Sequence, residues 1–342
     1  MENKVHAFGK FFDKIKISEI GVDMLGALVN GNLIQRNYRH LGSGISQNLH
    51  DLPPDQPRPA GDECFLAFKT LEYLCRNHDT MYHSMRLISI NTWCGKKFDA
   101  LMDFVLRERD QTDVFCFQEI FSTQSEVTKT NGYRANVYQE LRQNLPSFHS
   151  HFEPYLKHHN LAEPTTFHLE LGTASFVRDT YFITRHGRHQ IHRSQDDPMI
   201  GLQYETIPRH VQWLECQASA SSLIIANVHG MWFAGDKIDN PQAIMQSQRI
   251  CDFLNTIHPP LIMAGDFNLW PDTASIHMLE NAGLRNLIGE YHVASTRPRD
   301  WPFPHPFADY IFVSKDIAVT HFEVLPDEVS DHLPLAMEFT IK

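Results

Sequence analysis

The sequence predicts an α/β sandwich of four layers, in which two packed, mixed β-sheets are flanked by helices. From about residue 85 onward, short apolar segments of strand length alternate with longer segments whose apolar residues recur at helical spacing. Near the end of the chain, strand-like segments follow one another directly, as antiparallel neighbours do. A doubly wound parallel sheet is the alternative, and the hairpin-like end of the chain counts against it.

Composition limits the classes of protein to which this chain can belong. Its 342 residues, of which 42% are hydrophobic and 21% charged, are typical of a folded protein with a large core. The formal net charge of −11 argues against a protein that attracts nucleic acid by bulk charge. It does suit a site in which several carboxylates hold a cation.

Residues 1–84 are interpreted as an N-terminal helical extension. Apolar residues at helical spacing in 17–28 and again in 63–78 predict two helices. Between them, residues 51–60 (DLPPDQPRPA) contain four prolines in ten residues, which indicates an extended linker. Residues 85–342 are then a separate domain, and one hypothesis makes the extension a docking module for a membrane or a protein partner.

Strands are expected where short segments are strongly apolar, and helices where a longer apolar stripe follows a capping residue. The expected strands cover residues 86–91, 113–118, 171–177, 210–218, 222–228, 261–264, 307–313, 318–325 and 333–341. The expected helices cover residues 98–109, 122–143, 241–257 and 273–281. Asn240 is expected to cap the third helix, and Pro241 suits its first turn.

Residues 261–272 (LIMAGDFNLWPD) contain the most informative polar pair. Four apolar residues run into Gly265, where we expect the strand to break. In an extended segment Asp266 and Asn268 point to the same side, and Phe267 turns into the core. A carboxylate beside a carboxamide suits deprotonating and orienting a water molecule. A turn stabilised by the aspartate side chain is the competing interpretation.

Polar residues also end or follow almost all of the remaining strongly apolar strands. Each alone is better explained by a structural role, such as a turn, a helix cap or a buried histidine. Strand ends on one edge of a sandwich can, however, bring such residues into a single cleft, where ligands commonly bind. The residues concerned are Asn91, Gln118, Glu119, His229, Asp266, Asn268, Asp309, Asp331 and His332.

The order of these motifs resembles that of the endonuclease/exonuclease/phosphatase family, which includes deoxyribonuclease I, abasic-site endonucleases, neutral sphingomyelinases and inositol polyphosphate phosphatases. The matching pieces are SIN, QE, NVHG, GDFN, ADYIF and SDH, of which GDFN and SDH are the most specific. The resemblance covers about residues 85–342 and implies that they form a catalytic domain. Nothing before residue 85 belongs to the pattern.

The resemblance implies a metal site and a water-activating pair. Glu119 would be the main metal carboxylate, with Asn91 beside it and Asp331 nearby. Asp266 would polarise or deprotonate the attacking water, and Asn268 would orient the water or bind the phosphate.

The resemblance also implies roles for two histidines. His332 would donate to a non-bridging phosphate oxygen, while Asp309 holds its ring and favours its charged form. His229 matches the second histidine of the deoxyribonuclease and sphingomyelinase branches. Some relatives carry an acidic residue two positions after the first asparagine, where this chain has Trp93, so a ligand set that relies on that acid is in doubt.

The chemistry of these residue types leads independently to the same reaction. Phosphodiester hydrolysis builds negative charge on the phosphoryl and leaving oxygens, and a hard divalent cation offsets that charge. Because only oxygen ligands are offered, Mg²⁺ or Mn²⁺ is expected rather than zinc. We therefore expect a metal-dependent hydrolase acting on a nucleic acid, a lipid headgroup or a small phosphodiester. The alternative is an inactive phosphate-binding or scaffold protein on the same fold.

The loop at residues 229–240 lies between a strand end and a helix start, so it should border the cleft. Trp232 could stack a base or contact a lipid, and Lys237 could bind a phosphate. In the competing interpretation, the aromatic residues of this loop pack it onto the body. Residues 301–306 (WPFPHP) are a second candidate rim with the same ambiguity.

The remaining signals concern cysteines, histidines and location. Six cysteines are scattered singly, which predicts buried free thiols and a reducing compartment. His186, His189 and His192 lack a metal-ligand pattern and are expected to lie on the surface. No secretory leader and no transmembrane segment is recognised, so the cytoplasm is the expected location.

Overall fold

The computed structural model describes residues 84–342 except 195, 196, 198, 202, 219, 220, 234–236, 259 and 305. Almost all of the extension expected at residues 1–84, including its linker at 51–60, lies outside the described residues.

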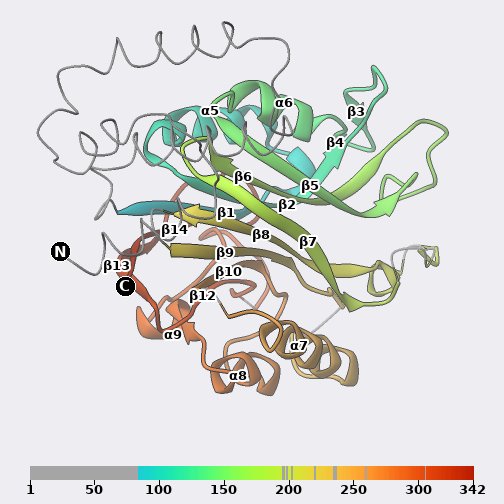
Figure 1. Cartoon of the computed structure of the whole chain (residues 1–342). Helices are drawn as coiled ribbons and strands as arrows, with labels where there is room; N and C mark the ends of the chain where they lie inside the picture. Colours follow the sequence, from blue (N-terminus) through green and yellow to red (C-terminus); the bar gives the residue numbers. More distant parts are fainter. Residues whose placement is uncertain are drawn as a thin grey trace, which may run out of the picture. The chain divides into compact units, whose positions relative to one another are not determined.

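Two six-stranded mixed sheets pack face to face (Figure 1). The first has the order β13-β14-β1-β2-β6-β5 and the second has the order β11-β12-β10-β9-β8-β7. Strands β1 and β2 are parallel, as are β9 and β10, and the other neighbours in both sheets are antiparallel. The first sheet is formed by β1 (Met85–Asn91), β2 (Val114–Ser122), β5 (Phe148–Lys157), β6 (Glu170–Arg178), β13 (Ile317–Val324) and β14 (Leu335–Ile341).

The second sheet carries the segment that the sequence singled out. It is formed by β7 (Phe182–His192), β8 (Arg209–Ala218), β9 (Ser221–His229), β10 (Leu261–Asp266), β11 (Arg285–Asn286) and β12 (Asp309–Val313). A separate two-stranded pair is formed by β3 (Lys129–Thr130) and β4 (Tyr133–Arg134).

Helices cover both outer faces, which completes the four layers (Figure 1). The first sheet is covered by α5 (Phe98–Glu108) and α6 (Val137–Asn144), and the second by α7 (Pro241–Leu254), α8 (Ala274–Asn281) and α9 (Leu287–Glu290). Short 3₁₀ turns are η1 (Trp93–Gly95), η2 (Arg109–Gln111) and η3 (Tyr204–Thr206). The predicted fold class is therefore confirmed for the described residues.

The two sheets are joined by an apolar core and by buried amides, among them Asn227 of β9 and Gln212 of β8. Asn227 of β9 donates through Nδ2 to the carbonyl oxygens of Phe117 (3.1 Å) and Ala174 (3.2 Å), and its Oδ1 accepts from Gln118 Nε2 at 2.7 Å. Asn227 is fully buried, so these bonds satisfy polar groups that water cannot reach. They connect the second sheet directly to β2 and β6 of the first.

Most expected elements are present, and the differences have physical causes. The helix expected at residues 122–143 is wrong: β2 runs on to Ser122, the β3–β4 pair follows, and only Val137–Asn144 is helical. Strands β5 and β7 were not expected because they are edge strands, whose mixture of polar and half-exposed residues lacks a clear apolar pattern. The strand expected to break at Gly265 continues through Asp266, since Gly265 pairs with both Val228 and Tyr310.

Local predictions elsewhere agree with the structure. Asn240 caps α7, because its side chain accepts from the backbone N–H groups of Gln242 and Ala243. The four described cysteines are free thiols, and Cys94, Cys116 and Cys216 are buried. No helix in the described part of the chain has the length and apolar character needed to cross a membrane.

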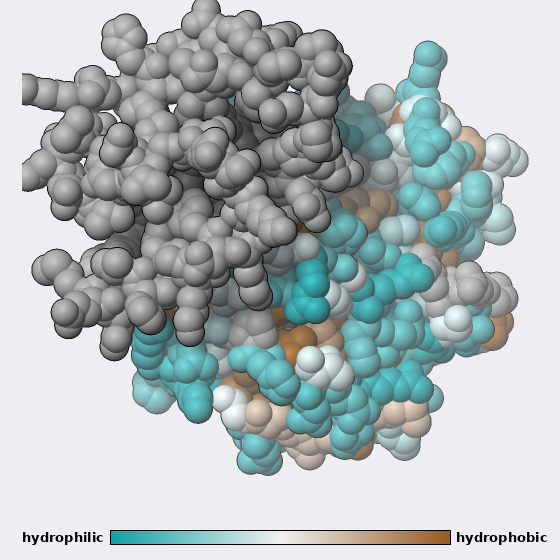
Figure 2. Space-filling view, viewed as in Figure 1, coloured by the Kyte–Doolittle hydropathy of each residue, from teal (hydrophilic) through white to brown (hydrophobic). Residues whose placement is uncertain are grey.

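The side of the domain drawn in Figure 2 is mostly hydrophilic where described residues are visible, with apolar residues in small patches. Single exposed apolar residues of this kind are ordinary on folded proteins.

Candidate active site

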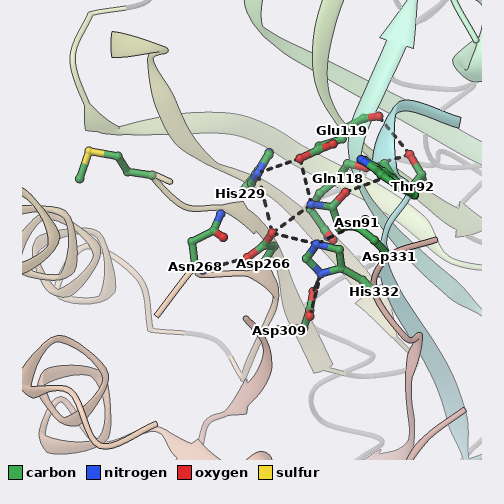
Figure 3. Close-up of polar contacts among 12 residues, drawn as sticks. Asn91, Thr92, Gln118, Glu119, His229, Asp266, Asn268, Asp309, Asp331 and His332 are labelled. Carbon is green, nitrogen blue, oxygen red and sulfur yellow. Dashed lines mark hydrogen bonds and ion pairs between the residues drawn. The ribbon is translucent and has the colours of Figure 1, made fainter. Parts of the chain in front are cut away.

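Strand register places three of the predicted residues in one row. Asp266, at the end of β10, pairs with His229 at the end of β9 and with Asp309 at the start of β12. Asn91 ends β1 in the first sheet, and His332 precedes β14. The candidate site therefore lies at one end of the sandwich and draws residues from both sheets (Figure 3).

Glu119 reaches the site through an irregularity in β2. The pairing with β6 shifts between Phe117 and Ile120, and Glu119 has a φ of 55°, in the left-handed region. A bulge of this kind re-aims a side chain. Thr92, which the sequence did not single out, holds the bulge because its Oγ1 donates to the backbone carbonyls of Gln118 (3.1 Å) and Glu119 (3.0 Å).

Asp266 occupies the centre of the cluster (Figure 3). Its Oδ2 accepts from Asn91 Nδ2 at 3.0 Å, and the same amide donates to Glu119 Oε1 at 3.2 Å. Its Oδ1 accepts from the backbone N–H of Asn268 at 2.8 Å. The turn proposed as the competing interpretation is thus present, and it coexists with a convergent site. Phe267 is fully buried, as expected.

His332 is held by Asp309. Its Nδ1 lies 2.8 Å from Asp309 Oδ2, which also accepts from Thr296 Oγ1 at 2.9 Å. The other ring nitrogen, Nε2, lies 3.6 Å from Asp266 Oδ2. Asp309 therefore orients the ring as the resemblance implied. Burial, with a contribution from Arg297, lowers the pKa of His332, so in the absence of a ligand the neutral ring is favoured rather than the charged one.

His229 has a partner that the sequence did not reveal. Its Nδ1 lies 2.9 Å from the hydroxyl of Tyr155, which is buried. Its Nε2 lies 3.7 Å from Glu119 Oε1 and 3.9 Å from Asp266 Oδ2. Burial first, and then the charge of Arg209, lowers the pKa of His229 well below its usual value. A neutral His229 has only one N–H group. The hydrogen bond with the Tyr155 hydroxyl influences whether Nδ1 or Nε2 carries that proton.

Asp331 is fixed by Arg297, a second residue without a sequence signal. Arg297 Nη1 donates to Asp331 Oδ2 and to its carbonyl oxygen, both at 2.9 Å. The guanidinium also lies over the ring of Trp301 at 4.1 Å from its centroid. Trp301, from the second candidate rim, contacts both the site cavity and an outer cavity of about 460 Å³.

A cavity of about 320 Å³ opens beside Asp266. The predicted substrate-binding residues Asn268, Trp232 and Lys237 all line it. Lys237 is 7% exposed, and burial lowers its pKa to about 8. Trp232 packs edge-on against Tyr204, with the ring centroids 5.5 Å apart. Trp232 therefore packs against the body of the domain, as the competing interpretation expected, and also lines the cavity.

The site carries an excess of carboxylates, of which Asp266 and Asp309 are buried and Glu119 and Asp331 are half-buried. Burial first, and then the charge of Asp331, raises the pKa of Glu119 to about 7, although the bond from Asn91 opposes this. A cation beside these carboxylates would offset their repulsion.

A second set of donors could also hold a metal ion. One ligand atom from each of Asp266, Asp309 and His332 lies within 4.8 Å of the others. Both Asp309 oxygens, however, lie within 2.9 Å of His332 Nδ1, and Oδ2 also accepts from Thr296. A cation there would compete with these contacts. Glu119 is held by longer contacts, since its Oε1 accepts from Asn91 Nδ2 at 3.2 Å and its Oε2 from Cys94 Sγ at 3.5 Å. His186, His189 and His192 lie on β7 outside both sets.

Comparison with known proteins identifies the family. The model described as "Endonuclease/Exonuclease/phosphatase family" matches residues 88–332. The chain belongs to the endonuclease/exonuclease/phosphatase family. The matched region begins in β1 and ends at His332, and so contains every predicted site residue. Proteins of this family are phosphoester hydrolases that usually use a divalent metal.

Solved structures show the same fold at low sequence identity. A mannosyl-6-phosphatase from Bacteroides thetaiotaomicron is 18% identical, with 75% of this chain and 100% of that chain covered and a TM-score of 0.56. The human Nocturnin catalytic domain with bound sulfate is 20% identical, with 76% and 95% covered and a TM-score of 0.55. An endonuclease/exonuclease/phosphatase from Bacteroides vulgatus is 17% identical, with 76% and 100% covered and a TM-score of 0.55. No curated protein matched the chain by sequence.

Proposed function

We propose that the protein is a divalent-metal-dependent phosphoesterase that hydrolyses phosphodiesters with an activated water. The position of Asp266 carries this proposal. Its Oδ2 lies within 4 Å of the Nε2 atoms of both His229 and His332 and accepts a hydrogen bond from Asn91. Among the described residues, no lysine or arginine bonds this buried carboxylate, and a carboxylate held between two imidazoles suits a general base.

The surrounding residues would then act on the phosphate. Asp266 accepts the proton of the attacking water, and Asn268 orients that water through its amide. As the water oxygen bonds to phosphorus, the bond from phosphorus to the leaving oxygen breaks, and that oxygen departs as an anion that solvent can protonate. His332 donates from Nε2 to a non-bridging oxygen, while Asp309 holds its ring at Nδ1. The approaching phosphate supplies the negative charge that the buried His332 needs to become protonated. Lys237 and His229 bind further phosphate oxygens.

We propose that Glu119 and Asp331 hold Mg²⁺ or Mn²⁺, with Asn91 beside them. The raised pKa of Glu119 supports this assignment, because its first two causes are burial and a second carboxylate. The Oδ1 of Asn91 accepts from the backbone N–H of Trp93 at 3.0 Å and retains a second lone pair. Trp93 offers no carboxylate at the position where some relatives have one. The bound ion would supply Lewis acidity that offsets charge on the phosphoryl oxygens.

Hydrolysis of bis-p-nitrophenyl phosphate tests the proposal directly. The full chain should release p-nitrophenol with Mg²⁺ or Mn²⁺, and EDTA should abolish the release. Asp266→Asn should lower kcat by about 10²–10⁴-fold, the usual contribution of a general base. Asp252→Asn, on the exposed face of α7, is the matched control and should leave kcat unchanged. Activity that survives Asp266→Asn would overturn the role of Asp266.

Two further measurements define the reaction class. Because one similar structure is a phosphatase, p-nitrophenyl phosphate should be assayed in parallel, and faster turnover of this monoester would overturn the preference for diesters. An inactive scaffold on the same fold is the competing function. Absence of both turnover and calorimetric Mg²⁺ binding would favour that scaffold.

A further inference from the structure

The cavity beside Asp266 has an aromatic wall that the proposed hydrolysis does not use. This wall is defined here as the side chains of Trp93, Tyr133, Tyr204 and Trp232, all of which line the cavity. Each is only partly buried, so part of its apolar surface faces the cavity or solvent. Water activation and metal binding use oxygen and nitrogen atoms, and they do not need the apolar faces of aromatic rings. The aromatic wall therefore indicates a feature of the substrate itself.

Four separate segments contribute to the aromatic wall. Trp93 comes from η1, Tyr133 from β4, Tyr204 from η3 and Trp232 from the loop after β9. The Lys96 ammonium lies 4.1 Å from the ring centroid of Trp93 and 5.2 Å from that of Tyr133. Together with the contact between Tyr204 and Trp232, this packing gives two braced pairs of rings. Preorganised rings bind a planar ligand with little loss of side-chain freedom.

Arg209 places a buried positive charge in the same cavity. It begins β8 and is 4% exposed, with its guanidinium 4.6 Å from the ring centroid of Tyr155. Its Nε and Nη1 atoms have no hydrogen-bond partner within the described part of the chain. Its charge acts on both Glu119 and His229. Leaving these two buried nitrogens of the guanidinium unbonded costs free energy that an anionic ligand would recover.

Lys237 is a second buried cation that lines the cavity, and its charge interacts with Asp266. Its Nζ is buried and has no hydrogen-bond partner among the residues that the structure describes. Its charge acts on Asp266, whereas that of Arg209 acts on Glu119. Within the described part of the chain, the cavity thus combines the aromatic wall with two buried cations that keep unbonded nitrogens, Lys237 Nζ and the Nε and Nη1 of Arg209. That combination matches a ligand with a phosphate at one end and a planar ring at the other.

Resting on the proposed phosphoester hydrolysis, we propose that the substrate is a nucleoside phosphate unit. Its base stacks on the aromatic wall, and its phosphate oxygens are bound by Arg209 and Lys237. The volume of about 320 Å³ is near the lower end for ligand pockets, so the cavity takes one such unit rather than a duplex. Sugar phosphates and inositol phosphates have no planar aromatic ring to stack. The net charge of −11 also disfavours a long nucleic-acid track.

Equilibrium binding tests this inference without turnover. Adenosine 5′-monophosphate and ribose 5-phosphate differ only by the base, and their affinities for the full chain with Mg²⁺ can be compared by calorimetry. We expect the nucleotide to bind at least fivefold more tightly, the lower limit for one stacked base, and to quench tryptophan fluorescence. Equal affinity of the two ligands, or tighter binding of inositol 1-phosphate, would overturn the inference.

Matched variants assign the effect to residues. Trp232→Leu and Tyr204→Leu keep apolar bulk without the ring and should each reduce the preference for the nucleotide, whereas Phe182→Leu, an exposed edge-strand control, should not. Arg209→Gln should weaken both ligands at least fivefold, and Arg107→Gln on the exposed face of α5 should weaken neither. A preference that persists in both ring variants would overturn the role of the aromatic wall.

Two sources can supply this unit, namely a free nucleotide and the end of a single strand. Comparing adenosine 5′-monophosphate with a short single-stranded oligonucleotide carrying a terminal phosphate separates them. The outcome also distinguishes the two proposals. Diester hydrolysis without a base preference would support the proposed hydrolase and overturn the nucleoside phosphate substrate. A base preference without hydrolysis would support nucleotide binding and overturn the proposed hydrolase.

Discussion

At the scale of single residues, the catalytic candidates carry sequence motifs and their supporting residues do not. Asp266 and His332 lie in short motifs that combine several polar types. Tyr155, Arg209 and Arg297 reach the site from distant segments, and nothing in their local sequence distinguishes them from ordinary core or surface residues. Their importance depends on contacts between segments more than thirty residues apart, which no single-sequence pattern reports.

The Tyr155 hydroxyl gives the first prediction. Tyr155→Phe removes the partner of His229 Nδ1 and leaves that buried nitrogen unbonded, which typically costs 1–3 kcal/mol. We expect kcat/KM for the chromogenic diester to fall by about tenfold. Tyr138→Phe is the control, because its hydroxyl bonds Ser150 elsewhere and its loss should reduce stability without reducing turnover. Equal kinetic effects of the two variants would show that Tyr155 acts only on folding.

His210 gives a prediction about acid stability. It is 2% exposed and both ring nitrogens lack a hydrogen-bond partner in the described part of the chain. Burial first, followed by the charges of Arg188 and Arg209, lowers its pKa from 6.5 to about 4, although Glu153 opposes this. Because the unfolded chain binds this proton at higher pH than the folded chain, the stabilisation is complete above pH 6.5 and is lost as pH falls towards 4. The loss is on the order of 3 kcal/mol.

Denaturant titrations at several pH values measure this dependence. His210→Gln should flatten the fall in unfolding free energy between pH 6.5 and pH 4. His149→Gln, on an exposed position of β5, should leave the slope unchanged. An unchanged slope in His210→Gln would contradict the burial argument.

At the scale of elements, the strands that build the site were predicted well, as was the edge strand β13, whereas the edge strands β5 and β7 were not. Strands β9 and β10 are buried, so apolar runs identify them directly. Strands β5 and β7 lie at sheet edges, where the pattern is mixed. The bulge that aims Glu119 has no sequence signature, because it depends on pairing with β6.

Gly265 permits the close approach of β10 to β9. Its φ is +143°, and a Cβ there would lie 2.0 Å from the carbonyl oxygen of Val228. Gly265→Ala should therefore lower the unfolding free energy by more than about 2 kcal/mol in denaturant titrations, because backbone must move. Gly283→Ala shares a positive φ (+97°) but meets nothing within 4 Å, so it should cost only about 1 kcal/mol. Equal costs would mean that backbone conformation alone, not the strand contact, requires the glycine.

At the scale of the whole molecule, the sandwich brings oxygen donors from both sheets to one end, where Asp266 is buried and Glu119 is half-buried. The alternation of elements and the order of motifs predicted this architecture. The relative positions of the two sheets were beyond prediction, because the contacts that fix them join residues such as Asn227 and Phe117 that are far apart in the sequence.

Metal binding should stabilise the whole domain. A cation that binds only the folded chain raises the unfolding free energy by about 2.7 kcal/mol at one hundred times its Kd. Mg²⁺ should therefore raise the thermal midpoint in a concentration-dependent way, and EDTA should reverse the shift. Glu119→Gln should remove the shift, whereas Glu126→Gln, at an exposed position, should retain it. An intact shift in Glu119→Gln would place the cation elsewhere.

The amide of Asn227 has a consequence for when the site comes into being. Glu119 belongs to one sheet and Asp266 to the other, so neither sheet alone contains both halves of the chemistry. Asn227 helps to fix the alignment of the two sheets, since its hydrogen bonds to the carbonyl oxygens of Phe117 and Ala174 require this alignment. Displacing one sheet by one residue would break these hydrogen bonds and would also move Glu119 away from Asp266. The proposed hydrolysis therefore requires the assembled sandwich, because each sheet supplies only part of the site.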